Sequence, residues 1–189
     1  MDTKTFTVRV AKPQDAPLIA QIVAMAIGDE LSLKDYCGEQ YLKVLEEIAL
    51  NEKTQYSFKN TLIAEIENVP IGAVIGYDGA KLFELRNYTF SIINQHLNKI
   101  PNMTAETQAG EFYLDSIAIL SNYRGQGFGK DLISALCKKA LAEGHENVGL
   151  LVDFENQKAE NLYSTLGFKR INETEFLGHK MWHLLKKLK

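Results

Sequence analysis

The chain has 189 residues, of which 46% are apolar and 24% charged, and this composition is ordinary for one folded domain with a substantial core. Its formal net charge of −3 provides no basic field to attract a nucleic acid, so no nucleic-acid partner is expected. The two cysteines, Cys37 and Cys137, form no C-x-x-C pair, and the four histidines show no metal-ligand spacing, so no bound metal is expected.

The N-terminal stretch MDTKTFTVRV lacks a basic region followed by an apolar core, which argues against secretion. No apolar run approaches the length of a membrane span. We therefore expect a cytoplasmic protein with reduced cysteines and no membrane partner. Because no repeat or linker-like stretch interrupts the chain, residues 1–189 are predicted to form a single domain that mixes strands and helices.

The first half of the chain begins with a predicted strand at Phe6, followed by a helix near 13–27 whose start suits Pro13 and Asp15. The apolar stripe of this helix comprises Leu18, Ile19, Ile22, Val23 and Ala26. A second helix is expected at 40–51, after a polar link.

A hairpin follows the second predicted helix. Its strands are TLIAEIE and IGAVIGY, and Asn68, Val69 and Pro70 separate them. The segment 80–100 then predicts a helix, although its apolar pattern is mixed, and PNMTAETQAG predicts a polar loop.

The second half has clearer patterns. EFYLDSIAIL is almost continuously apolar, as in a strand buried on both faces. The next helix, KDLISALCKKALAEG, has a stripe formed by Leu132, Ile133, Leu136, Cys137, Ala140 and Leu141. NVGLLVD predicts another buried strand, NQKAENLYSTLGF a short helix, and FKRIN and HKMWHLL two closing strands.

The strongest functional signal is a glycine-rich turn between the buried strand and the helix after it. It reads Arg124, Gly125, Gln126, Gly127, Phe128 and Gly129. The first turn of a helix has unpaired N–H groups and a partial positive charge, and glycines let a phosphate approach those groups closely. We therefore predict that this turn binds a phosphate or pyrophosphate.

Two nucleotide-binding motifs fit this turn less well. A mononucleotide loop requires G-x-x-x-x-G-K-[ST], but Asp131 follows Lys130 and Arg124 occupies the position of the first glycine. A dinucleotide fingerprint requires G-x-G-x-x-G directly after the strand, whereas here the spacing is G-x-G-x-G after a polar link. Asp153, at the end of the next strand, is the feature that keeps the dinucleotide reading open.

Three segments together resemble the GNAT superfamily of N-acetyltransferases. SIAILSNYRGQGFG is similar to the family's acetyl-CoA signature, with Arg124, Gly127 and Gly129 at the matching positions. VDFENQKAENLYSTLGF resembles the family's next strand and helix, and VRVAKPQDAPLIAQIV its opening strand and helix. The resemblance therefore covers nearly the whole chain.

This resemblance implies a fold and a cosubstrate. The expected fold is a mixed α/β, GNAT-like one, with a central twisted sheet of about six or seven strands that splays beside the glycine turn. The family binds acetyl-CoA there, which places the pantetheine arm against Ile117, Ala118 and Ile119, and the pyrophosphate on the amides from Arg124 to Gly129. Lys130, Asn156, Ala159 and Tyr163 complete the expected cofactor-binding set.

Two residues are candidates for the chemistry. Tyr163 matches a position where many GNAT enzymes have a tyrosine facing the CoA sulfur, which makes it the expected proton donor; a core tyrosine is the alternative. Asp115 is a carboxylate in an apolar strand, and alternation places it on one face with Tyr113, Ile117 and Ile119. Burial would raise its pKa, as suits a general base, but an aspartate bracing a turn would look the same.

Asn156 has two readings that are compatible with each other. It matches a family residue that contacts the CoA arm, and it is also a suitable N-cap for its helix.

The acceptor is a primary amine that the sequence does not identify. The link GDELSLKDYCGEQ is acidic, which would suit a cationic amine, although a solvated loop would have the same composition. Residues 78–110 are an insertion relative to minimal family members, and we expect a helical cover over the acceptor site. An acetyl-CoA sensor without turnover is the alternative to an enzyme, and a homodimer is compatible with the sequence.

Overall fold

A computed structural model describes residues 5–189, so the first four residues of the N-terminal stretch considered above lie outside it. A seven-stranded sheet with the order β1-β2-β3-β4-β5-β7-β6 forms its centre. The strands are β1 (Phe6–Val10), β2 (Thr61–Ile66), β3 (Val69–Asp78), β4 (Phe112–Ile119), β5 (Asn147–Asp153), β6 (Lys169–Phe176) and β7 (His179–Lys187).

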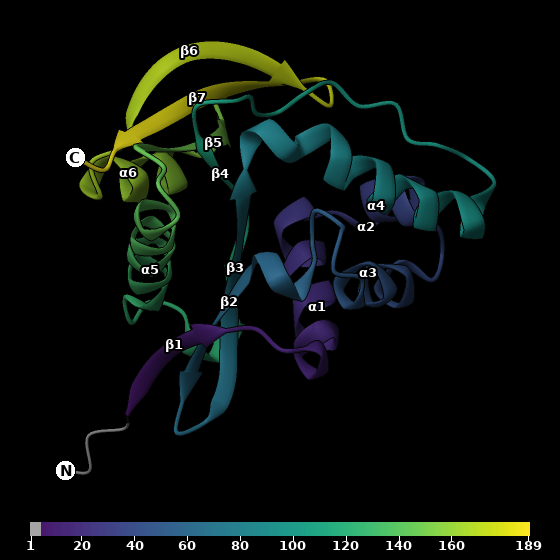
Figure 1. The fold of residues 1–189 in the computed structure, drawn as a ribbon, viewed down its shortest axis with the longest axis horizontal. Helices are drawn as coiled ribbons and strands as arrows, with labels where there is room; N and C mark the ends of the chain where they lie inside the picture. Colours follow the sequence, from purple (N-terminus) through teal and green to yellow (C-terminus); the bar gives the residue numbers. More distant parts are fainter. Residues whose placement is uncertain (1–4) are drawn as a thin grey trace.

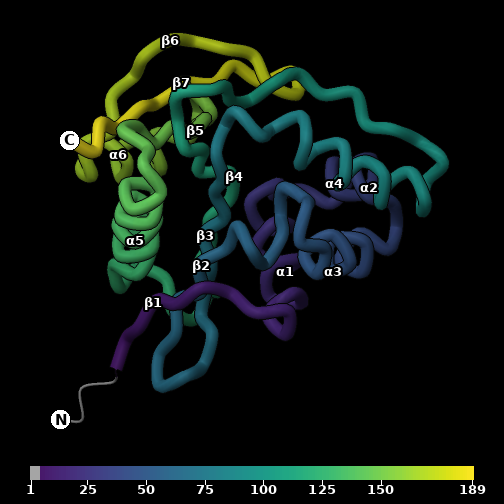
Figure 2. Tube along the Cα trace, viewed as in Figure 1, coloured from purple at the N-terminus to yellow at the C-terminus, as the bar shows by residue number. Residues whose placement is uncertain are grey.

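Helices cover both faces of the sheet (Figure 1). They are α1 (Ala16–Ile27), α2 (Glu30–Cys37), α3 (Tyr41–Leu50), α4 (Leu82–Leu97), α5 (Phe128–Ala142) and α6 (Gln157–Thr165). The tube view shows α1 to α4 grouped on one side and α5 and α6 on the other (Figure 2). The predicted mixed α/β architecture with a sheet of about six or seven strands is confirmed, and α4 lies between β3 and β4 in the chain as expected.

The sheet splays between β4 and β5. These two strands run parallel, whereas their neighbours pair antiparallel. Their ladder contains only the pairs Phe112 with Val148 and Tyr113 with Gly149. Because β4 continues to Ile119 and β5 to Asp153, the two strands diverge towards their C-terminal ends and leave a cleft between them.

The hydrophobic core has one large cluster on each face of the sheet. On the side of α1 it includes Ile19 and Ile22, and on the side of α5 it includes Leu132 and Leu136. The predicted helical stripes are largely buried, but Ala26 and Leu141 are exposed. Both lie in the last turn of their helices. Near the end of α1, Met25 and Ile27 contact the core instead.

Two local expectations were wrong. The acidic link between the first two predicted helices contains α2, which begins because the Asp29 side chain accepts a hydrogen bond from the Ser32 amide at 2.8 Å. The turn of the β2–β3 hairpin is formed by Glu67 and Asn68, both in the left-handed region, and Pro70 belongs to β3.

Within residues 5–189 no single helix is both long and apolar enough to cross a bilayer. The helical pair Pro13–Ile27 and Glu30–Cys37 meets that criterion only when the two are joined across a bend of 120°.

Candidate active site

The glycine turn is fastened to the end of β4 and leads into α5. Gly125 (φ 79°) and Gly127 (φ 93°) have left-handed backbone conformations, and Gly127 is the N-cap of α5. Such conformations are costly for residues with a Cβ, so glycine is required at both positions. The Arg124 Nε donates a hydrogen bond to the carbonyl oxygen of Ile119 at 2.9 Å. The turn is therefore held at the mouth of the cleft between β4 and β5.

The backbone amides of this turn are free. Across residues 5–189, the hydrogen bonds of the structure use none of the N–H groups of 125–129; the first amide in use is that of Lys130, which donates to Gly127 O at 2.8 Å. These amides lie at the positive end of a helix of 15 residues. The arrangement is that of an anion site, as the sequence predicts.

A cavity of about 650 Å³ lies next to the turn and has the size of a typical ligand site. It brings together seven of the residues expected to bind the cofactor: Ile117, Ala118, Ile119, Arg124, Lys130, Asn156 and Ala159. It also includes five residues outside that expected set: Met25, Lys158, Asn161, Leu162 and Thr165. Four of these five lie on α6, as does Ala159, so they belong to the same helix that the expected set already included. Met25 comes from α1, and its place here was not readable from the sequence.

Asp115 sits at a bulge in β4. The ladder with β3 pairs Ser116 with Ile75 and Leu114 with Gly76, so Asp115 is the extra residue. Strand alternation is therefore broken at this point. Ile117 and Ile119 pack in the cluster on the side of α5, together with Leu114.

Asp115 itself turns towards the opposite face. Tyr113 packs on that face with Tyr77, and the Tyr77 hydroxyl donates to Asp115 Oδ2. The prediction that Asp115 shares a face with Ile117 and Ile119 is thus wrong, whereas the prediction that it shares a face with Tyr113 is right. The bulge is the physical reason.

The carboxyl group of Asp115 is held by two hydroxyl donors. Tyr77 Oη donates to Oδ2 and Ser116 Oγ to Oδ1, each at 2.8 Å. Desolvation raises the pKa of Asp115 above its usual value, although these hydrogen bonds and the Arg86 charge oppose the shift. The residue is only half-buried, but it does not line the cavity beside the glycine turn.

Tyr163 lies on the other side of β4 from Asp115, in the core cluster beneath α5 and α6. Its ring packs edge-on against Phe168, with centroids 5.6 Å apart. Burial raises the pKa of Tyr163 to about 12, so the phenol is protonated at neutral pH. It is 8% exposed and does not line the cavity beside the glycine turn.

Asn156 is the N-cap of α6, because its Oδ1 accepts a hydrogen bond from the Ala159 amide at 3.1 Å. The structural reading of this residue is confirmed. Since Asn156 also lines the cavity, its amide nitrogen can contact a bound molecule at the same time.

The insertion is part of the core. α4 buries Leu82, Leu85, Ile92 and Ile93 together with the polar residues Arg86 and Thr89. Arg86 of this helix is ion-paired with Glu106 in the following loop. The Gln55 side chain donates hydrogen bonds to both Glu106 and Tyr77, and it thereby connects the pair to β3. Sequence reasoning missed this polar group. The available signal was the mixed apolar pattern of 80–100, in which Arg86 interrupts the buried side.

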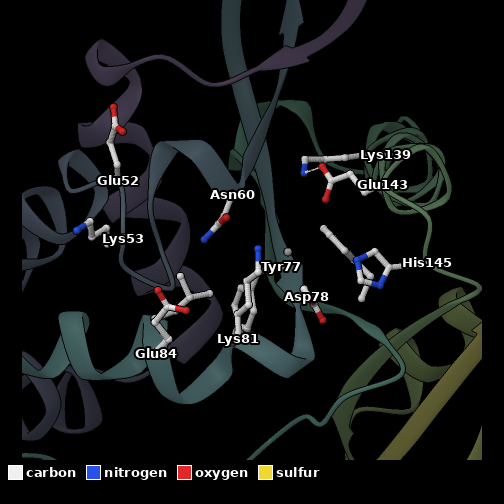
Figure 3. A pocket seen from close by; sticks show the side chains of 13 residues that line it. Glu52, Lys53, Asn60, Tyr77, Asp78, Lys81, Glu84, Lys139, Glu143 and His145 are labelled. Carbon is white, nitrogen blue, oxygen red and sulfur yellow. Dashed lines mark hydrogen bonds and ion pairs between the residues drawn. The ribbon is translucent and has the colours of Figure 1, made fainter.

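A second cavity, of about 480 Å³, lies at the other end of α5 (Figure 3). Its lining includes His145 and charged side chains of both signs from the segment after α3, the end of β3, the segment before α4, α4 itself, α5 and the residue that follows it: Glu52, Lys53, Asp78, Lys81, Glu84, Lys139 and Glu143. Lys139 and Glu143 are paired with each other. This cavity is distant from the glycine turn by nearly the length of α5, about 20 Å.

Among residues 5–189 no group of three or more histidine, cysteine or carboxylate side chains is placed to hold a metal ion. Both cysteines are buried and free.

Comparisons with known proteins agree with the fold. The thialysine N-epsilon-acetyltransferase of Mus musculus is 40% identical over 63 residues, which cover 33% of this chain and 37% of that protein. The match thus spans little more than a third of the relative's length.

Two crystal structures match nearly end to end. An acetyltransferase superposes with a TM-score of 0.82 at 27% identity, covering 97% of this chain and 100% of that one. An N-acetyltransferase from Staphylococcus aureus Mu50 gives 0.81 at 26% identity, covering 95% and 99%. The model of the acetyltransferase (GNAT) family matches residues 30–168, which include the glycine turn and both diverging strands. This chain is a member of the GNAT acetyltransferase family.

Proposed function

We propose that this protein is an acetyl-CoA-dependent N-acetyltransferase that passes the acetyl group to a primary amine by direct attack while both substrates are bound. The observation that carries the proposal is the row of free amides at 125–129, at the start of α5 and at the mouth of the cleft between β4 and β5.

These amides fit the pyrophosphate of acetyl-CoA. Hydrogen bonds to a charged group contribute about 1.5–3 kcal/mol each, so several of them anchor a diphosphate even after its dehydration. Lys130 adds a positive charge on the lining of the same cavity. Arg124 adds a second one, while its Nε holds the turn to β4.

The open edge of β4 fits the pantetheine arm. From Leu114 onwards β4 has no partner on the side that faces β5, so the backbone near Ile117 and Ile119 can pair with the amides of the arm. Ala159 and Asn156 lie across the cleft, on α6. Acetyl-CoA bound in this way extends from the glycine turn along β4, and its thioester lies towards the bulge at Asp115.

The two candidate catalytic groups lie on opposite sides of β4, which suits their roles. An alkylamine with a pKa near 10.4 must lose a proton before it attacks, at a cost of roughly 4–5 kcal/mol at pH 7. Asp115, with its raised pKa and hydroxyl donors, is the proposed base on the acceptor side. Tyr163, protonated and buried on the side of α6, is the proposed donor to the leaving thiolate.

The acidic residues near α2 do not support a cationic acceptor groove. Asp29 caps the helix, Glu30 and Glu39 pair with Lys34, and Asp35 pairs with Lys99. Carboxylates that are already partnered have little left to offer a ligand. Asp115, which is half-buried and is held by hydroxyl donors with no ion-pair partner of its own within residues 5–189, is therefore the better source of any preference for a cationic amine.

Calorimetry followed by a turnover assay tests the proposal. We expect acetyl-CoA to bind at one site per chain and free CoA to be released when an amine panel is added. The panel contains thialysine, aliphatic diamines, aminoglycosides, peptides with free N-termini and lysine-containing peptides. Absence of acetyl-CoA binding would overturn the proposal, and binding without turnover across the panel would favour a sensor module.

A further inference from the structure

A chain of buried polar side chains connects the insertion to Asp115. Arg86 on α4 and Glu106 in the following loop are ion-paired and are 4% and 8% exposed. Glu106 Oε1 accepts a hydrogen bond from Gln55 Nε2 at 3.1 Å. The same nitrogen donates to Tyr77 Oη at 3.1 Å, and Tyr77 donates to Asp115 Oδ2. The charged side chains of Arg86 and Glu106 are thus connected to Asp115, the proposed base, by a short series of hydrogen bonds.

Arg86 also fixes the loop that carries its partner. Its Nη1 donates to the carbonyl oxygens of Met103 and Thr104 at 3.1 and 2.9 Å. α4 and the loop therefore hold Glu106 in place beside Gln55 and Tyr77. Burial of an arginine and a glutamate is costly unless both are paired and hydrogen-bonded, so a pair retained here invites a functional explanation.

We propose that the Arg86–Glu106 pair sets the protonation state of Asp115, and that Tyr77 is the positioning residue that transmits the pair's geometry to this carboxyl group. The inference rests on the proposed function, in which Asp115 is the base. It assigns the insertion at residues 78–110 a role in setting the protonation state of Asp115, in addition to any contact with the acceptor.

Arg86 is the charged group that acts on Asp115 in this network, and Glu106 reaches it through Tyr77, whose hydroxyl lies 3.4 Å from Glu106 Oε1. The other groups around Asp115 come from α2, the segment before β2, β3 and β4, and are neutral hydroxyls: Tyr36, Tyr56, Tyr77, Tyr113 and Ser116. Burial raises the pKa of each of these four phenols, so they remain protonated at neutral pH. The positive charge of Arg86 favours the ionised form of Asp115, and the negative charge of Glu106 opposes it.

Two substitutions in the full-length protein should therefore move the titration of Asp115 in opposite directions. Arg86→Met removes the positive charge and should raise the titration midpoint by about one pH unit or more. Glu106→Gln removes the negative charge and should lower the midpoint. The measurement is carbon-13 NMR of carboxyl-labelled aspartate, with the Asp115 signal assigned by its loss in Asp115→Asn. Loss of packing alone would not produce shifts of opposite sign.

Three further variants complete the test. Arg86→Lys keeps the charge and should leave the midpoint near its original value. Arg9→Met removes another arginine that pairs with two carboxylates, Asp15 and Glu65, away from the site, and should not move it. Tyr77→Phe removes a donor to the carboxylate and should raise the midpoint. If Arg86→Met does not fold, Glu106→Gln still decides the question, because an unchanged or raised midpoint in that variant would overturn the role of the pair.

The outcomes separate the two proposals. Unchanged midpoints in Arg86→Met and Glu106→Gln, or shifts in the same direction, would overturn the role of the pair even if Asp115→Asn abolishes turnover. Opposite shifts combined with full turnover in Asp115→Asn would confirm the electrostatic link and would show that another group is the base.

Discussion

Tyr77 in β3 and Asp115 in β4 are joined across the bulge by a hydrogen bond of 2.8 Å between the phenol oxygen and the carboxylate. Because the bulge moves Asp115 off the face it would occupy in a regular strand, the carboxylate meets Tyr77 and not the apolar side chains of Ile117 and Ile119. The bulge thereby separates the proposed base from the side of β4 that packs with α5.

Replacement of Asp115 by asparagine should reduce turnover by about a hundredfold or more, because the amide cannot accept a proton from the amine. The affinity for acetyl-CoA should not change, since the carboxyl lies on the opposite face from the cavity. Steady-state kinetics and calorimetry with acetyl-CoA measure the two effects. Ser116→Ala, which removes only a hydroxyl donor to the same carboxylate, is the matched control and should retain most of the activity.

Replacement of Tyr163 by phenylalanine should lower turnover at saturating substrates while the fold remains intact, since the ring packing against Phe168 is unchanged. Because burial raises the pKa of Tyr163 to about 12, the phenol remains protonated below that pH. The activity of the unaltered enzyme should therefore show no loss from this group as the pH rises to 10. A decline of turnover between pH 8 and 10 that disappears in Tyr163→Phe would contradict this reading.

Gly127→Ala should weaken both the fold and the binding of acetyl-CoA, because an alanine at φ 93° is strained by about 1–2 kcal/mol and displaces the amides of the turn. Gly178→Ala is the matched control. It imposes similar strain at φ 80° in the β6–β7 turn, so it should lower the melting temperature without changing acetyl-CoA affinity. Equal affinities in the two variants would argue against the glycine turn as the pyrophosphate site.

Asp15 should make the fold sensitive to acid. Burial alone would raise its pKa, but hydrogen bonds from Arg9 and the Lys12 amide outweigh burial and hold the pKa below its usual value. A carboxylate with a lowered folded-state pKa contributes stability above its unfolded value, near 3.9, and loses that contribution as the pH falls through the folded value.

Asp15→Asn should therefore reduce the free energy of unfolding by about 2 kcal/mol at pH 7 and by much less near pH 2. Urea unfolding at both pH values measures the difference. An equal loss at the two pH values would mean that the charge of Asp15 is not what stabilises the β1–α1 junction.

The sequence by itself determined the glycine turn and the order of the strands and helices apart from α2. It could do so because these features are local: apolar periodicity, N-capping and the conformational freedom of glycine depend on neighbouring residues. The expected residues along the cavity beside the turn came from the resemblance to the GNAT family. The helix α2 was missed because its eight residues bury only Leu33 and Cys37, too few to show a stripe.

Only the tertiary structure decided the surroundings of Asp115. A β-bulge depends on how two strands pair, and the meeting of Arg86, Glu106, Gln55 and Tyr77 depends on segments up to 51 residues apart in the chain. No local pattern encodes such contacts. They arise because the insertion buries α4 against the rest of the domain, and the enclosed polar groups must then find partners among one another.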